Sequence, residues 1–141
     1  MSFPDVSNNI QPVVRRADII LPELSYKIVG TLFDVYNDIG FGHLERVYQA
    51  AVAGKLSDQK INFIEQVPVV ISSEGKEIGK YYLDFLINDS IILELKQGKR
   101  FNKTNYDQVN AYLISKHLQL AILASFTPQG VIFKRLVNLT N

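Results

Sequence analysis

The sequence predicts an α/β fold in which helices flank a mixed central sheet of about five strands. Apolar residues recur at spacings of three and four over residues 24–56, and the pattern then changes to alternation rich in β-branched residues. A further helical pattern over residues 105–117 separates two groups of strands. The order α-α-β-β-β-α-β-β joins an antiparallel meander to a helical crossover, which is typical of one sheet with helices on both faces.

Two amphipathic helices begin the domain, which we expect to span residues 22–141 after an N-terminal tail or arm over residues 1–21. The first helix is expected from Leu24 to Ile39, and glycines 40 and 42 end it. The second is expected from His43 or Leu44 to residues 57–60. The apolar stripes of the two helices are Leu24, Ile28, Leu32, Val35 and Tyr36, and then Leu44, Val47, Tyr48, Ala51, Val52 and Leu56.

The five expected strands cover residues 62–72, 77–87, 91–96, 119–126 and 131–137, with glycine-containing turns at 73–76 and 127–130. Pro68 predicts that the first strand lies at an edge of the sheet or is bulged, because proline cannot donate to a central ladder. A basic, polar loop over residues 97–104 leads into the helix at 105–117.

The hairpin between the second and third strands decides whether three polar residues meet. A two-residue loop would put Asp84 on the opposite face from Glu94 and Lys96, whereas a three-residue loop, 88–90, puts all three on one face. The three-residue loop is favoured because one apolar face then results, made of Leu83, Phe85, Leu93 and Leu95.

Two carboxylates opposed across a ladder repel each other, so this arrangement needs positive charge. Lys96 supplies one charge, and a divalent cation would supply two more; hard oxygen ligands suit Mg²⁺ or Mn²⁺. The plainer interpretation is an ordinary solvated strand face. Glu45, in the first turn of the second helix, and the pair Gln108 and Tyr112, four residues apart on one helix face, also have plainer interpretations as helix-dipole and surface residues.

Taken in order, these motifs resemble the GxxExxY proteins, a branch of the PD-(D/E)xK nuclease superfamily. The naming motif matches Gly42, Glu45 and Tyr48, and the nuclease core matches Asp84 and Glu94-Leu95-Lys96, with Leu83 in place of the proline in the superfamily name. The resemblance implies a restriction-endonuclease-like core and a metal-dependent nuclease acting on DNA, or alternatively RNA.

The resemblance also implies residue roles. The catalytic residues would be Asp84, Glu94, Lys96, Glu45 and Gln108. The metal ligands would be Asp84, Glu94, the carbonyl of Leu95 and, directly or through water, Glu45. Lys99, Arg100, Lys103 and Tyr112 would contact nucleic acid. Phe101 would either stack on an unpaired base or pack on the core.

Composition limits the other function classes. The 141 residues contain no cysteine, which excludes disulfides and thiolate chemistry, and the net charge of +1 provides no overall basic footprint. We therefore expect a second copy or another protein to help hold a duplex, and the alternative function is a non-catalytic nucleic-acid-binding module. A third candidate is hydrolysis of another phosphoester. No signal peptide or membrane span is expected, so the predicted location is cytoplasmic.

Overall fold

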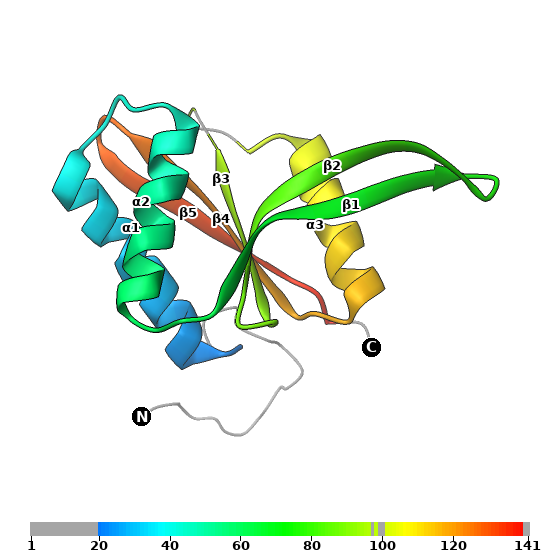
Figure 1. The fold of residues 1–141 in the computed structure, drawn as a ribbon, viewed down its shortest axis with the longest axis horizontal. Helices are drawn as coiled ribbons and strands as arrows, with labels where there is room; N and C mark the ends of the chain where they lie inside the picture. The colour runs from blue at the N-terminus through cyan, green and yellow to red at the C-terminus, as the bar shows by residue number, and fades with distance from the viewer. Residues whose placement is uncertain (1–19, 97, 99–100, 140–141) are drawn as a thin grey trace, which may run out of the picture.

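Helices cover both faces of one five-stranded sheet in the computed structural model, which describes residues 20–96, 98 and 101–139 (Figure 1). The elements are α1 (Pro22–Ile39), α2 (Glu45–Asp58), β1 (Phe63–Ser73), β2 (Lys76–Ile87), β3 (Ile91–Lys96), α3 (Lys103–Lys116), β4 (Leu120–Thr127) and β5 (Gly130–Val137). The predicted class and element order are confirmed, with bounds that differ by about two residues at most.

The helix α3 begins two residues before its predicted start because Asn102 caps it. The side chain of Asn102 accepts a hydrogen bond from the backbone N–H of Asn105 at 2.9 Å, which satisfies a donor that the first turn would otherwise leave unpaired. The helix therefore begins at Lys103.

Among the described residues, no helix is long and apolar enough to cross a membrane.

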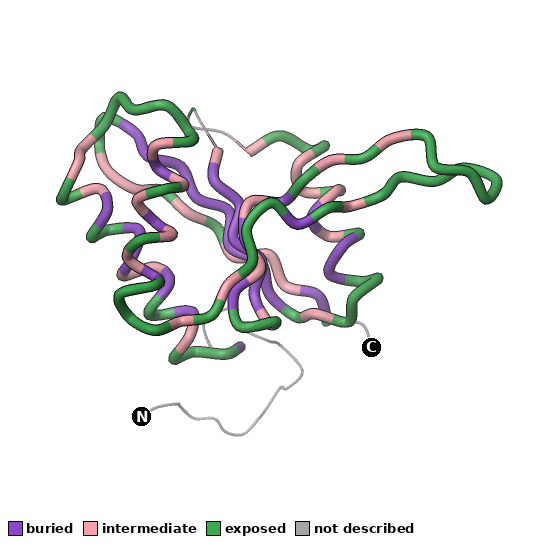
Figure 2. Tube along the Cα trace, in the orientation of Figure 1, coloured by how far each residue is buried: buried purple, intermediate pink, exposed green. Residues whose placement is uncertain are grey.

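The strands follow each other across the sheet in the order β1-β2-β3-β4-β5. Only β3 and β4 are parallel among these neighbours, and α3 connects them. Pro68 lies in β1 at an edge, as predicted, where its missing N–H costs no central hydrogen bond. The outer part of the β1–β2 hairpin extends beyond the rest of the fold and is mostly exposed (Figures 1 and 2).

The register of the β2–β3 hairpin is the one that a three-residue loop predicts. Ile87 pairs with Ile91 and Phe85 with Leu93, so the next position places Asp84 across from Glu94. Asn88 and Asp89 both adopt left-handed backbone angles, with φ of 51° and 53°, which these two residue types tolerate better than most.

Two hydrophobic cores lie on opposite faces of the sheet. One, beneath α1 and α2, includes Phe85 and Leu93, and the other, beneath α3, includes Ile92 and Val109. The expectation that Leu83 shares a face with Phe85 is wrong, because Leu83 packs in the α3 core. The two residues flank Asp84, so the side chains of β2 change layer at that residue.

Candidate active site

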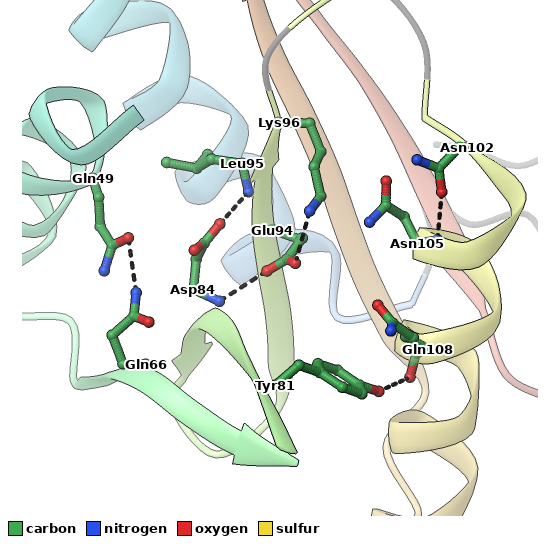
Figure 3. Close-up of polar contacts among 10 residues, drawn as sticks. All are labelled: Gln49, Gln66, Tyr81, Asp84, Glu94, Leu95, Lys96, Asn102, Asn105 and Gln108. Carbon is green, nitrogen blue, oxygen red and sulfur yellow. Dashed lines mark hydrogen bonds and ion pairs between the residues drawn. The ribbon is translucent and has the colours of Figure 1, made fainter. Parts of the chain in front are cut away.

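The candidate site lies where β2 and β3 stop pairing. Beyond the Phe85–Leu93 pair, carboxylates replace the backbone partners: Oε1 of Glu94 accepts from the N–H of Asp84 at 2.8 Å, and Oδ2 of Asp84 accepts from the N–H of Leu95 at 2.7 Å (Figure 3). Each carboxylate thus satisfies a backbone donor that the separating strands would leave unpaired. The two side chains are held opposite one another by the backbone of the partner strand.

Lys96 provides the positive charge of the site. Its ammonium lies 3.4 Å from Oε2 of Glu94, whose other oxygen is already occupied by Asp84 (Figure 3). Glu94 is only 6% exposed, whereas Lys96 is half-buried and reaches the surface of the site. A buried carboxylate therefore fixes the position of an accessible amine.

The acidic pair is not fully compensated. Burial, and then the neighbouring charge of Asp84, raise the pKa of Glu94 to about 7, although the Asp84 N–H and Lys96 act in the opposite direction. Burial also raises the pKa of Asp84 against the effects of the Leu95 N–H and Lys96. One ammonium is thus insufficient for a buried and a half-buried carboxylate, and a further cation would be stabilised here.

Glu45 joins this cluster from the first turn of α2. Although its side chain is largely exposed, partial burial and the charge of Asp84 raise its pKa, while Lys96 lowers it. An open cavity of about 660 Å³, the acidic cavity, is lined by four of the predicted residues, Glu45, Asp84, Glu94 and Lys96. The fold therefore brings together an acid from a helix, two acids from neighbouring strands, and an amine.

The loop between α1 and α2 positions Glu45. The hydroxyl of Tyr48 donates to the carbonyl of Gly40 at 2.6 Å, and the Tyr48 ring stacks on Phe126 with 4.1 Å between centroids. Gly40 and Gly42 have φ of 72° and 105°, conformations that favour glycine. Leu44 is 57% exposed, so the prediction that it lies on the inner face of the helix is wrong; it lies at the cavity mouth.

Replacing Tyr48 with phenylalanine is expected to lower the free energy of unfolding by about 1–2 kcal/mol, because the Gly40 carbonyl loses a buried donor while the ring stack is kept. Urea denaturation measures this loss. Tyr26→Phe is the matched control, since the Tyr26 side chain is 79% exposed. Equal stability of Tyr48→Phe and the wild type would contradict the proposed anchoring of the loop.

Sequence reasoning missed two glutamines beside the site. Gln66 forms a hydrogen bond that lowers the pKa of Asp84, and its Nε2 donates to Oε1 of Gln49 on α2 at 3.0 Å (Figure 3). Gln49 in turn donates to Glu65 at 3.1 Å. The available signal was the polar Glu65-Gln66 step inside an otherwise apolar strand. Gln66 also has a left-handed φ of 54°, which a sequence pattern does not reveal.

Other predicted residues lie outside the acidic cavity. Tyr112 is 6% exposed and packs in the α3 core, and its contact with nucleic acid stays a prediction. The backbone carbonyl of Gln108 accepts from the hydroxyl of Tyr81 at 2.9 Å, and Gln108 does not line the acidic cavity (Figure 3). Phe101 is half-buried and packs on the same core, 6.4 Å from Tyr106 between ring centroids.

Of the three basic residues predicted to bind nucleic acid after β3, the structure describes one, Lys103. Lys99 and Arg100 lie outside the described residues. Lys103 is exposed and forms an ion pair with Asp107 at 2.7 Å, one helical turn along α3.

The acidic cavity offers few side-chain ligands for a divalent ion. Within residues 20–96, 98 and 101–139, no group of three or more His, Asp or Glu side chains could hold a metal by itself. Mg²⁺ is commonly held by one or two carboxylates while several waters complete its shell. Asp84 and Glu94, both oxygen donors with raised pKa values, fit that requirement.

Comparisons with known proteins identify the family of the chain and a similar fold. A family model described as the PD-(D/E)XK nuclease superfamily matches residues 22–136. A crystal structure of SSO0001 has 19% sequence identity and a TM-score of 0.51, over 68% of this chain and 50% of that one. This chain thus spans about half the length of that structure, and the similarity concerns the fold alone. The search of curated proteins gave no match.

Proposed function

The chain belongs to the PD-(D/E)XK nuclease superfamily, and from this premise we propose that it hydrolyses phosphodiester bonds of DNA in the cytoplasm with Mg²⁺ or Mn²⁺. RNA is the alternative polynucleotide. The observation that carries the proposal is the reciprocal bonding of Asp84 and Glu94 across the separating strands, with Lys96 3.4 Å from Glu94. This geometry presents two oxygen ligands and one ammonium to a single open cavity.

Asp84, Glu94 and the carbonyl of Leu95 would hold the metal. The N–H and C=O of one strand residue point to the same edge, so the Leu95 carbonyl faces the side on which its N–H bonds Asp84. Glu45 would complete the shell directly or through water. A bound divalent ion polarises a phosphate oxygen and lowers the pKa of its water.

Lys96 would orient the attacking water and stabilise the negative charge that grows on the phosphoryl oxygens during in-line attack. Glu94 is suited to hold this ammonium in place because it is buried and fixed by the Asp84 N–H. Gln108 would position water or the phosphate backbone from α3, and Lys99, Arg100 and Lys103 would hold flanking phosphates.

We further propose that the chain falls in the GxxExxY branch. The α1–α2 loop supports this assignment, since each residue of the motif has a separate structural task. Gly42 adopts a left-handed φ of 105°, Glu45 lines the acidic cavity, and Tyr48 bonds the loop at Gly40.

The function is tested with labelled single- and double-stranded DNA in Mg²⁺, in Mn²⁺ and in chelator. Cleavage is expected with either metal and not with chelator, and an Asp84→Asn preparation purified in parallel controls for contaminating nuclease. DNA binding without cleavage under every condition would instead support the non-catalytic module. Hydrolysis of a small phosphoester, with no cleavage of any polynucleotide, would support a different phosphoesterase.

The net charge of +1 gives a single chain little attraction for a duplex. We therefore propose that a second copy or another protein adds binding surface. Sedimentation of the purified protein with and without DNA measures the number of copies, and a monomer in both states would leave another protein as the required partner.

A further inference from the structure

A second cavity adjoins the acidic one. It has a volume of about 350 Å³ and shares Leu44, Glu45 and Lys96 with the acidic cavity. Its other walls are mainly apolar and aromatic, and they include Phe41, His43, Tyr48 and Phe126. Lys96 thus lies at the junction of an acidic cavity and an aromatic one.

The aromatic cavity is built on rigid rings. Tyr48 and Phe126 stack nearly parallel, with 9° between their planes, and His43 and Tyr48 lie edge to face with 5.6 Å between their centroids. The hydroxyl of Tyr48 donates to the Gly40 carbonyl, and Nε2 of His43 bonds the Ile39 carbonyl. Both side-chain polar atoms are therefore paired with the backbone. The cavity surface that a ligand could contact is therefore largely aromatic and aliphatic.

Two further apolar side chains flank this cavity with much of their surface in solvent. Phe41 is 55% exposed and Leu44 is 57% exposed, although both line the cavity. Covering this surface with a flat apolar group would be favourable. Phe101, for which stacking on a base was one of two interpretations, packs on the α3 core, whereas Phe41 is an exposed ring in the cavity that Lys96 also lines.

We propose that the aromatic cavity receives one unpaired base of the nucleic acid strand, while the phosphate attached to that nucleotide lies at Lys96. This inference rests on the proposed function, because the acidic cavity identifies the phosphate position. A ligand with a flat ring close to a phosphate is a nucleotide, and a volume of about 350 Å³ is at the small end for ligand cavities, which suits one ring system.

The substrate class follows from the cost of exposing a base. In a blunt duplex the bases are paired and stacked, and removing one costs a few kcal/mol, whereas a single strand or a frayed end avoids this cost. The preferred substrate is therefore a single strand, or a duplex with unpaired nucleotides at the point of cleavage.

The test combines a change in the protein with a change in the DNA. Binding is measured by fluorescence anisotropy in chelator, so that no cleavage occurs, with a labelled single strand and with the same strand carrying abasic sites. Phe41→Ala is expected to weaken binding of the normal strand about tenfold or more, the effect that one stacked base supplies, and to leave the abasic strand unaffected. Tyr26→Ala, which removes an exposed ring outside the cavity, is the control and should not change either affinity.

Equal weakening of both strands by Phe41→Ala, or weakening of neither, would overturn the base-binding proposal. Cleavage in Mg²⁺ is measured separately on the same strands. Metal-dependent cleavage without a base-dependent effect would reject the aromatic cavity and keep the nuclease. A base-dependent effect without cleavage would reject the nuclease and keep the cavity as a base-binding site.

Discussion

Asp84→Asn is expected to reduce metal-dependent cleavage of DNA by roughly a thousandfold or more, because loss of one anionic ligand removes several kcal/mol of metal-derived transition-state stabilisation. The fold should persist, since the amide oxygen of asparagine can still accept from the N–H of Leu95. Initial rates in Mg²⁺ measure the loss. Thermal unfolding with and without Mg²⁺ measures metal binding independently, and the stabilisation by Mg²⁺ should disappear.

Asp89→Asn is the matched control for this substitution. Asp89 lies exposed in the hairpin turn at the far end of β2, where asparagine tolerates the same left-handed φ of 53°. This variant should cleave DNA and bind Mg²⁺ as the wild type does. Cleavage by Asp84→Asn at a rate near that of Asp89→Asn would refute the assigned metal ligand.

Glu94→Gln is expected to abolish cleavage and at the same time to stabilise the metal-free protein at alkaline pH. The pKa of Glu94 is about 7 in the folded protein, above its ordinary 4.5, because the side chain is buried and close to Asp84. The folded state therefore binds the proton more tightly than the unfolded state. The resulting stabilisation is complete below pH 4.5 and is lost as pH rises through 7.

The size of the expected loss of stability follows from the rise in the pKa of Glu94. The metal-free wild type should lose on the order of 3 kcal/mol of unfolding free energy between pH 4.5 and pH 8, whereas Glu94→Gln, neutral throughout, should show a flatter profile. Urea denaturation in chelator at several pH values measures both curves.

Glu77→Gln, at an exposed site on the β1–β2 hairpin, is the control for a lost surface carboxylate and should follow the wild-type profile. Parallel profiles for Glu94→Gln and the wild type would show that Glu94 does not retain a proton in the folded state. Addition of Mg²⁺ at pH 8 should restore stability to the wild type and not to Glu94→Gln.

Local sequence patterns were sufficient for most of the chain's architecture. Spacings of three and four placed α1 and α2, alternation placed the strands, and Pro68 placed β1 at an edge. The sequence left a two-residue or a three-residue loop open after Ile87, and the structure has the favoured three-residue register, which places Asp84 across from Glu94. The start of α3 was misplaced because Asn102 was interpreted as part of a loop rather than as a cap.

The predictions were wrong where side chains do not follow the regular spacing of their strand or helix. Strict alternation put Leu83 with Phe85, but the strands separate at Asp84 and Leu83 enters the other core. The helical stripe put Leu44 inside, yet α2 begins only at Glu45 and Leu44 precedes its first turn. Helical spacing also put Tyr112 beside Gln108 without showing that α3 turns the Tyr112 ring into its own core.

By itself, the sequence determined the order of the elements and singled out the acidic pair with its lysine, and it favoured one of two hairpin registers, because periodicity, turn length and strand alternation act between residues near one another in the chain. Only the tertiary structure decided that Glu45 and Gln66 approach Asp84, and that Phe41 and Phe126 enclose a cavity beside Lys96. These contacts depend on how α2 and its preceding loop pack against the sheet, and packing between distant segments leaves no periodic trace in either one.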